Sequence, residues 1–537
     1  MTSDGGARAL AVAAAGYLVV LAWAMANLSY DIWGALVLAP ILITVGVLLL
    51  RVLFRGSQGD LFGLMVLGLL AKLAGGVARY WVSFDAYGGA TDAQRYHAYA
   101  ARAASDVWTG SVPWSNILPH GTGTEFFERF TALVYSLTGT SRLGGFFVFS
   151  WLSFWGVAFF VKAALLAVPG LARRRYVALT TLAPSVIFWP SSIGKEAFMF
   201  LTLGVGTFGV ARLLAGRNLF VAIAMAGVGF GAALFVRPHI VGVWVAGVIP
   251  GLAIALLRRP TGRRLSGAPS GARTLMMLFV IVIALFGMSL IAQTTVDYLN
   301  PGSDEVSATS IEEILAETTR RTSESGSTFV PPSVDSPADW PYASIRTLTR
   351  PLLFEARGAG QLLAAAEILA LLGLCALAWR RLANIPRLMV VNPYVTFALT
   401  TLFLSGLAYS SFANLGVLTR QKSLVYPFLT LIPCLPWATA LPVPQPSREP
   451  ARVARLRPRP ASVGATAGRM QPAARRRSDR HPEIWGNDVV GSVQKSSTSP
   501  SDRAQLGRGG GPGSVRARHV RTGPPPGKGS QPDDIWG

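Results

Sequence analysis

Long apolar runs alternate with short polar or basic breaks along the chain, from its first residues to about residue 443. Most of these runs reach or approach the roughly 18 to 20 residues that a helix needs to cross a hydrocarbon core of about 30 Å. The pattern predicts about twelve spans, at residues 8–28, 33–54, 61–82, 143–168, 176–190, 196–214, 219–236, 239–257, 274–293, 361–380, 393–412 and 424–443.

The runs are solid, whereas the strands of a membrane β-barrel would alternate apolar and polar residues over about ten positions. A helix satisfies its own backbone hydrogen bonds in lipid, so we predict an all-α, polytopic integral membrane helical bundle. The first run, 8–28, lacks a clear small-residue cleavage site and another run follows closely. We therefore expect it to anchor the chain and not to be a removed signal peptide.

The composition changes at Pro444, after which Pro, Gly, Ser and Arg predominate and large apolar residues are few. This division predicts a transmembrane helical domain, residues 1–443, and a disordered, basic, Pro/Gly/Arg-rich cytoplasmic tail, residues 444–537. The tail contains Ile-Trp-Gly twice, at 484–486 and 535–537. Two interpretations stay open: the tryptophans dock into a cytoplasmic partner, or the repeat reflects chance or a weak membrane contact of a basic tail.

Only 14% of the residues are charged, against about 25% in a typical soluble domain. The net charge of +22 is compatible with nucleic-acid binding, but the basic residues flank the spans or lie in the tail. We therefore expect membrane lipids and no nucleic acid as partners. A prevalence of Arg over Lys, with many Ala and Gly, is typical of a high-GC bacterial genome. The predicted location is a bacterial plasma membrane, crossed many times.

The positive-inside rule gives the orientation. With the N- and C-termini in the cytoplasm, all of the strongly basic breaks also face the cytoplasm: Arg51 and Arg55, Arg173 to Arg175, Arg217, Arg258 to Arg264, and Arg380 with Arg381. Two large loops, about 83–142 and 294–350, then face outside. In the first of them the Gly88-Gly89 turn and the capping-box spacing of Thr91 and Gln94 predict a helix that begins at Asp92.

The densest group of chemistry-bearing residues lies in this first loop: Asp85, Asp92, Arg95, Tyr96 and His97. On a helix from Asp92, positions 92, 95, 96 and 99 share one face. A carboxylate there can act as general base on a sugar hydroxyl, while the aromatic rings stack on the sugar and the cation binds substrate. The alternative is that Asp92 only stabilises the helix dipole and pairs with Arg95.

A second candidate is the segment from Phe188 to Glu196, where Pro190 and Gly194 interrupt an apolar run. Lys195 and Glu196 then begin the next span. Free backbone N–H groups and an ammonium at a helix N-terminus form an anion site, for which a lipid phosphate is the natural ligand. The segment is not a Walker A loop, because Trp189 replaces its first glycine and Glu196 replaces its Ser or Thr. The alternative is a plain turn with an interfacial lysine.

Further arginines are predicted on the outside, where they are costly in topology. Because guanidinium groups grip phosphate oxygens with two donors, we predict phosphate-binding roles for these arginines and their neighbours: Arg237 with His239, Arg350 with Glu355, and Arg420. The alternative is anchoring to ordinary phospholipid head groups. Lys72 and Glu367 fall inside spans, where ionisable groups are usually paired or functional, and their similar depth favours a mutual pair.

No motif in the sequence indicates a metal or a cofactor. HExxH, paired Cys/His zinc spacings, a GxSxG elbow and a clean DxD are all absent, and Cys375 and Cys434 both lie inside apolar runs. We predict no cofactor. A divalent metal is possible but not indicated, and the nearest candidate ligands are Asp85 and Asp92.

An Asp-bearing first large outside loop that opens into an interfacial helix, on a scaffold of many spans, resembles membrane glycosyltransferases of the GT-C class. The outside arginines are also similar to those of bacterial polysaccharide polymerases and ligases. The resemblance implies a polyprenyl-phosphate or polyprenyl-diphosphate sugar donor and a glycan acceptor, with Asp85 or Asp92 as the base and Lys195, Arg237, Arg350 and Arg420 as phosphate ligands. The chain departs from the class in placing this loop after the third span, and in having no globular extracytoplasmic domain.

The leading hypothesis is therefore extracytoplasmic glycosyl transfer or polymerisation during assembly of a cell-envelope polysaccharide or glycolipid. Two alternatives stay open. A transporter or flippase of lipid-linked glycans or another anionic solute predicts an internal repeat and a polar path at the membrane midplane. A non-enzymatic envelope scaffold predicts that the Trp-Gly tail matters more than the outside loops.

Overall fold

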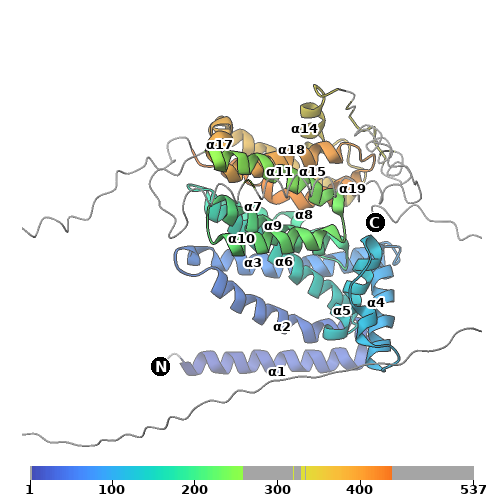
Figure 1. Cartoon of the computed structure of the whole chain (residues 1–537). Helices are drawn as coiled ribbons and strands as arrows, with labels where there is room; N and C mark the ends of the chain where they lie inside the picture. Colours follow the sequence, from blue (N-terminus) through green and yellow to red (C-terminus); the bar gives the residue numbers. More distant parts are fainter. Residues whose placement is uncertain are drawn as a thin grey trace, which may run out of the picture. The chain divides into compact units, whose positions relative to one another are not determined.

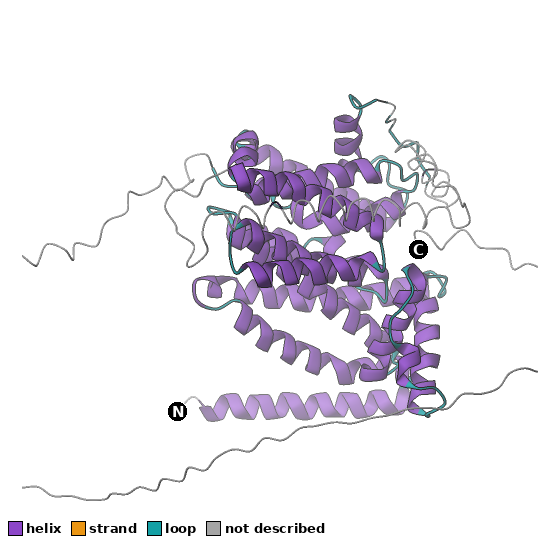
Figure 2. Ribbon diagram, in the orientation of Figure 1, coloured by secondary structure: helices purple, strands orange, loops and turns teal. Residues whose placement is uncertain are grey.

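The computed structural model describes residues 3–257, 278, 319, 328–332, 334 and 336–437. Across these residues the chain is all-helical, and its only β-type pairing is an isolated bridge between Thr328 and Asn414 (Figures 1 and 2). The predicted span 274–293, most of the loop 294–350 and the tail 444–537 lie outside the described residues.

The described part forms a helical bundle whose longer members lie side by side (Figure 1). Its first half comprises α1 (Ser3–Asn27), α2 (Tyr30–Leu53), α3 (Phe62–Trp81), α4 (Asp92–Trp108), α5 (Gly123–Thr138), α6 (Arg142–Ala167), α7 (Arg173–Thr181), α8 (Pro184–Phe188), α9 (Lys195–Leu214), α10 (Leu219–Leu234) and α11 (Pro238–Leu257). Its second half comprises α14 (Trp340–Thr349), α15 (Ala359–Leu377), α16 (Trp379–Leu382), α17 (Ile385–Val391), α18 (Pro393–Tyr409), α19 (Leu415–Lys422) and α20 (Tyr426–Leu429).

Six helices among the described residues are long and apolar enough to cross a membrane: Tyr30–Leu53, Gln58–Ala86, Arg142–Ala167, Lys195–Leu214, Pro238–Leu257 and Ala359–Leu377. A seventh crossing results if α16–α17 and α18, which are bent by 111° at their junction, count as one span. These helices match six of the predicted runs closely. The full set of about twelve spans is not confirmed.

Proline explains two of the differences between prediction and structure. The predicted span 176–190 is broken, because Pro184 disfavours helical backbone at the residue before it; α7 ends at Thr181 and α8 begins at Pro184. The predicted span 424–443 is a series of short turns as far as the structure describes it, and Pro427 and Pro433 each open one of those turns. Both segments are largely apolar, but their described residues do not form one continuous helix.

Close helix packing fixes the position of α9. The backbones of α6 and α9 meet at Gly156 and Gly204, where a Cβ on either glycine would overlap backbone atoms of the other helix. Gly229 of α10 approaches α9 in the same way near Gly206. Small residues allow this approach in a lipid environment, where van der Waals packing drives helix association. The N-terminus of α9, with Lys195 and Glu196, is therefore held against two neighbouring helices.

Two ionisable residues, the buried Lys72 and the half-buried Glu367, hold the short helix α8 inside the bundle. The Lys72 ammonium donates to the carbonyl oxygen of Val186, and the backbone N–H of Ser185 donates to both carboxylate oxygens of Glu367 at 3.2 Å. The Ser185 hydroxyl also donates to Glu367. A break in a span leaves backbone groups unsatisfied, and these side chains satisfy them. The predicted direct pair between Lys72 and Glu367 is wrong, since each side chain contacts α8 instead.

Helices α4 and α5 pack against each other and run across one end of the bundle helices in Figure 1. Gly123 at the start of α5 donates its backbone N–H to the carbonyl oxygen of Phe235, at the end of α10. The α4–α5 pair therefore lies beside the ends of the bundle helices at which α9 and α11 begin. The candidate site is at this junction.

Candidate functional site

Helix α4 begins at Asp92, as the sequence predicts, but not by the predicted capping box. Gly88 and Gly89 adopt positive φ values of 57° and 83°, which form the turn before the helix. Thr91 is the N-cap residue with extended backbone, yet its side chain makes no capping hydrogen bond. The turn therefore aims the first residue of α4, Asp92, toward the ends of α9 and α19.

Glu196, in the first turn of α9, is the centre of a buried ion-pair network. One carboxylate oxygen accepts a hydrogen bond from Arg237 Nη2 at 2.7 Å and lies 2.7 Å from Arg420 Nε in an ion pair. The other oxygen accepts from Arg420 Nη2 at 2.9 Å. The Glu196 side chain is 1% exposed and that of Arg237 is 2% exposed. Arg237 also donates Nη1 to Gln421 Oε1 at 2.7 Å. Both oxygens of this carboxylate are therefore occupied by guanidinium groups.

Asp92 extends this network toward solvent. Arg420 donates Nη1 and Nη2 to the same Asp92 oxygen, Oδ2, at 3.1 Å each. The second oxygen, Oδ1, makes no hydrogen bond to any other described residue, and the Asp92 side chain is 33% exposed. Asp92 is thus fixed at one oxygen and accessible at the other.

Two further cations lie within electrostatic range of these carboxylates. Arg79, near the end of α3, packs over the rings of Phe188 and Trp189 at 4.9 and 5.2 Å from their centroids, and its buried Nε has no hydrogen-bond partner in the described part of the chain. Lys195 donates to Thr124 Oγ1 at 2.8 Å. Neither side chain forms an ion pair with a carboxylate of the described residues.

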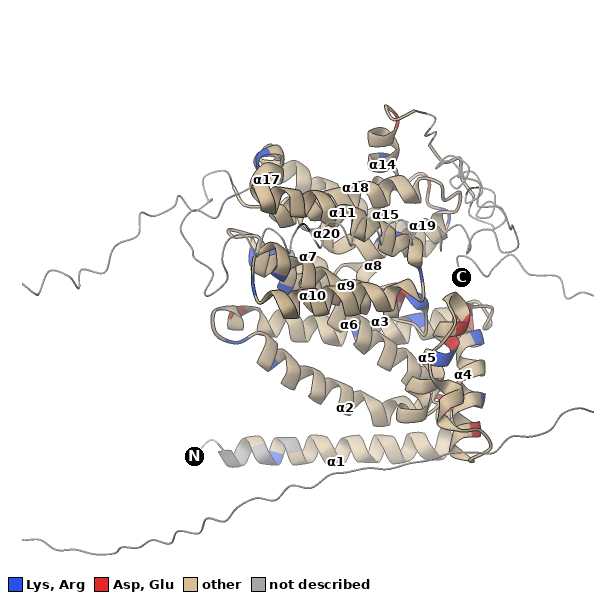
Figure 3. Ribbon diagram, in the orientation of Figure 1, with Lys and Arg blue, Asp and Glu red and all other residues tan. Residues whose placement is uncertain are grey.

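These six residues, which we call the charged cluster, come from α3, α4, α9, α19 and the turn before α11: Arg79, Asp92, Lys195, Glu196, Arg237 and Arg420. Figure 3 shows the basic and acidic segments meeting where α9 and α4 come together. Four cations surround two carboxylates, so the cluster carries excess positive charge in a largely buried place. Such a site favours an anionic ligand.

The cluster shifts the pKa values of residues at its edge. Burial alone lowers the pKa of Arg420, but the carboxylates of Glu196 and Asp92 outweigh this effect and raise it above its ordinary value. Burial and the nearby Asp92 carboxylate raise the pKa of Tyr96. The Arg420 guanidinium therefore stays charged and the Tyr96 phenol stays protonated at neutral pH.

The structure brings together Asp92, Lys195, Glu196, Arg237 and Arg420 from the predicted candidates, with Tyr96 and His239 beside them. Tyr96 is buried with its ring against Phe127, and His239 lies within electrostatic range of Arg237 and Lys195.

Arg95 and His97 point to other parts of the chain. Arg95 pairs with Glu128 of α5 at 2.9 Å, and the buried His97 ring is hydrogen-bonded to Tyr135 at 2.9 Å. Burial lowers the pKa of His97, so its imidazole is neutral at pH 7. Positions 92, 95, 96 and 99 therefore do not act as one functional site: Asp92 and Tyr96 lie at the cluster, whereas Arg95 and Tyr99 line a separate cavity on the neighbouring stripe of α4.

Arg350 and Glu355 form a separate pair. Arg350 Nε lies 3.0 Å from a Glu355 oxygen, and its guanidinium packs over Phe329 at 4.4 Å from the ring centroid. The connection to the cluster is indirect, because Lys422 on α19 donates to the backbone carbonyl of Arg350. Asp85 is exposed in the short π-helix Val82–Ala86 and makes no ion pair with the cluster cations.

Sequence reasoning missed Arg79 and Gln421 as site residues. Arg79 lies at the end of a predicted span, where a charged residue is usually interpreted as an interfacial anchor. Its only sequence signal is that the positive-inside rule disfavours arginine on the predicted outside. Within the described ranges, no three His, Cys, Asp or Glu side chains converge to hold a metal ion.

Comparison with known proteins does not identify a family for this chain. No protein-family model, curated protein or solved structure matches the chain.

Proposed function

We propose that the protein transfers or polymerises sugar from a polyprenyl-phosphate or polyprenyl-diphosphate donor, at the extracytoplasmic face of a bacterial plasma membrane. In this proposal the chain crosses the membrane about twelve times, with both termini in the cytoplasm and the charged cluster outside. The observation that carries the proposal is the composition of the cluster: four cations around two carboxylates, one of which keeps an accessible oxygen.

The excess cations favour a phosphate ligand. A buried site with uncompensated positive charge is unfavourable by itself, and a bound phosphate or diphosphate would neutralise it. Arg79 and Lys195 have unengaged donors: Arg79 is held by aromatic rings, and the Lys195 ammonium uses one of its three N–H groups on Thr124. The apolar helices around the cluster suit a lipid that carries the phosphate.

The proposed chemistry is a direct displacement at the anomeric carbon of the donor sugar. The acceptor hydroxyl oxygen forms a bond to this carbon, and the bond between the carbon and the phosphate oxygen breaks. The phosphate leaves with the bonding electron pair, and the hydroxyl proton passes to Asp92 Oδ1 as general base. Arg79, Lys195 and Arg420 stabilise the negative charge that develops on the leaving group.

Glu196 has a positioning role in this scheme. Both of its oxygens are bound by Arg237 and Arg420 and it is 1% exposed, so it cannot take a proton from a substrate without losing these contacts. It holds the two guanidinium groups in place instead. Asp85 is an exposed carboxylate with no ion pair to the cluster cations, which makes it the matched control for Asp92.

The test is mass spectrometry of polyprenyl-linked glycans in a strain that lacks the gene, complemented with wild type, Asp92→Asn or Asp85→Asn. We expect lipid-linked sugar to accumulate in the deletion strain, and wild type and Asp85→Asn to clear it. Asp92→Asn should leave it accumulated while the variant protein is present in the membrane at the wild-type level.

Unchanged lipid pools in the deletion strain contradict the proposal. A second contradicting result is complementation by Asp92→Asn that equals wild type. If the donor accumulates only in the cytoplasmic leaflet, the protein moves the lipid across the membrane and is a flippase, not a transferase.

A further inference from the structure

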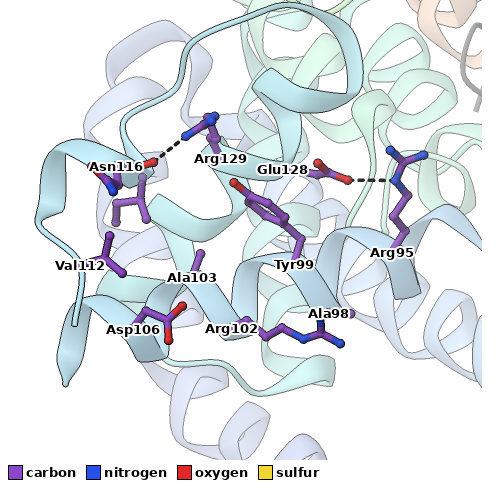
Figure 4. Close-up of a pocket in the computed structure, with 11 residues that line it drawn as sticks. Arg95, Ala98, Tyr99, Arg102, Ala103, Asp106, Val112, Asn116, Glu128 and Arg129 are labelled. Carbon is purple, nitrogen blue, oxygen red and sulfur yellow. Dashed lines mark hydrogen bonds and ion pairs between the residues drawn. The ribbon is translucent and has the colours of Figure 1, made fainter. Parts of the chain in front are cut away.

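A second polar site lies on the α4–α5 pair. It is a cavity of about 630 Å³ between one face of α4, one face of α5 and the segment 112–117 (Figure 4). This volume is within the range of small-molecule binding sites, about 300–1,000 Å³. The charged cluster is not part of its lining.

The helical repeat of α4 separates the cavity from the charged cluster. Arg95, Tyr99, Arg102 and Asp106 are spaced by four, three and four residues, so they form one stripe along α4, and all four line the cavity. Asp92 and Tyr96 belong to the stripe that faces the cluster. A single helix therefore presents one row of side chains to the cluster and another to the cavity.

Some of the cavity's polar groups are already paired. Arg95 pairs with Glu128, and Arg129 donates to the carbonyl oxygen of Asn116 at 2.6 Å and to Glu125 at 3.2 Å. Figure 4 shows the first two of these contacts at the wall of the cavity.

The side chains of Tyr99, Arg102 and Asp106 make no hydrogen bond or ion pair with other described residues, and all three are exposed. The cavity therefore offers an aromatic ring, a guanidinium and a carboxylate that have no partner in the described part of the chain.

The mixture of charges restricts the ligand. The carboxylates of Asp106 and Glu128 disfavour a polyanion, the three arginines disfavour a polycation, and these five charged side chains together disfavour a lipid chain. A neutral molecule with many hydroxyl groups fits, because each hydroxyl can both donate to a carboxylate and accept from a guanidinium. The Tyr99 ring supplies a flat apolar surface for the C–H face of a sugar ring, with its own hydroxyl at the edge.

We infer that this cavity binds a neutral oligosaccharide, and that it is the acceptor subsite of the proposed transferase. The second part of the inference rests on the proposed function. Tyr99 lies seven residues along α4 from Asp92, a rise of about 10 Å. A glycan chain bound in the cavity can therefore extend along α4 and present its terminal hydroxyl to Asp92 Oδ1.

The test is binding of the purified full-length protein, in detergent, to an immobilised panel of neutral, uronic-acid-containing and amino-sugar oligosaccharides. We expect retention on neutral members of the panel, with affinity weakened about tenfold or more by Tyr99→Ala and by Asp106→Asn. Tyr342→Ala is the matched control, because Tyr342 is an exposed tyrosine on α14 that does not line the cavity. Since Tyr99 and Asp106 are exposed, their variants should fold normally.

Asp92→Asn separates this inference from the proposed function, because it should abolish transfer and leave glycan retention unchanged. Retention that Tyr99→Ala and Asp106→Asn do not alter overturns the acceptor cavity, even if the wild-type protein transfers sugar. Preference for uronic-acid-containing or amino-sugar members also overturns it. Retention that depends on Tyr99, in a protein that leaves lipid-linked sugar pools unchanged in the deletion strain, supports the cavity and overturns the transferase.

Discussion

The charged cluster and the contacts around α8 both hold ionisable side chains that are buried or half-buried, but the two regions use them differently. Around α8, Lys72 donates to the carbonyl oxygen of Val186 and Glu367 accepts from Ser185, so each ionisable group is engaged by the backbone or hydroxyl of one short helix. In the charged cluster the cations outnumber the carboxylates, and Arg79 has no ion-pair partner in the described part of the chain.

The difference indicates which buried charges stabilise the fold and which bind a ligand. An ionisable side chain that hydrogen-bonds to the free backbone groups of a broken helix has a structural role and needs no substrate to account for it. A buried group of cations with too few anionic partners either lowers the stability of the fold or binds an anion. This reasoning disfavours a transport path through the Lys72 and Glu367 region, although an interrupted helix such as α7–α8 is also a feature of transporters.

The largest effect is expected from Glu196→Gln, which tests whether the ion pairs of Glu196 stabilise the fold. Removing this charge leaves Arg237 buried beside Arg420 without their shared carboxylate, which should lower the free energy of unfolding by about 3–5 kcal/mol. Thermal unfolding followed by intrinsic fluorescence in lipid nanodiscs measures it. Asp60→Asn is the control, because it removes the exposed surface pairs with Arg173 and Arg174, each of which contributes about 0–1 kcal/mol. Equal shifts for the two variants contradict the account.

Asp92→Asn should separate chemistry from stability. Loss of the general base should lower turnover of a purified polyprenyl-phosphate sugar donor about 10²- to 10⁴-fold. The unfolding free energy should change by no more than about 1 kcal/mol, since the pair with Arg420 is partly exposed. Asp85→Asn should alter neither quantity. Turnover by Asp92→Asn within a few-fold of wild type is incompatible with its role as base.

Glu367→Leu should show the opposite pattern to Asp92→Asn: it should lower stability without affecting the ligand site. The backbone N–H and hydroxyl of Ser185 lose their acceptor, which should cost about 1–3 kcal/mol of stability. Affinity for a polyprenyl phosphate should stay at the wild-type value, because Glu367 does not contact the cluster. A loss of affinity that exceeds the loss of stability would place this region in the ligand site.

A pH-dependent effect is expected from Lys422, at the end of α19. Burial lowers its pKa to about 7, against an opposing contribution from Glu367. Between pH 7 and about 10.4 the unfolded chain holds this proton and the folded protein does not, so stability should rise with pH, by at most about 1.4 kcal/mol per pH unit. Below pH 7 both states hold the proton and the contribution is constant. Lys422→Met should flatten the rise, and an unchanged slope contradicts the shift.

The sequence predicts the apolar helices better than their interruptions. Six of the predicted runs correspond to helices long enough to span, because length and hydropathy are local properties. The break at Pro184 depends on whether neighbouring side chains can satisfy the freed backbone groups. Lys72 and Glu367, which do so, are far from Pro184 in sequence, so a hydropathy pattern cannot reveal the contact.

Part of the charged cluster was also predictable. Asp92 lies in the densest polar segment of the first outside loop, and Lys195 and Glu196 begin a helix after an interrupted apolar run. Arg237 and Arg420 are arginines on the predicted outside, where the positive-inside rule disfavours them. Their pairing was not predictable, since it depends on how α4, α9 and α19 meet. The direction of the Arg95 side chain was not predictable for the same reason: an i to i+3 spacing places Arg95 near Asp92, but the ion pair with Glu128 of α5 turns it away from the charged cluster.

The most direct test of the central claim is the affinity of the purified protein for a polyprenyl phosphate, compared between wild type, Arg79→Met and Glu367→Leu. The account predicts that Arg79→Met weakens binding about tenfold or more, which corresponds to about 1.4 kcal/mol, without lowering thermal stability. Glu367→Leu should lower stability and leave the affinity unchanged. Equal affinity of wild type and Arg79→Met would contradict the assignment of the cluster's excess positive charge to a phosphate ligand.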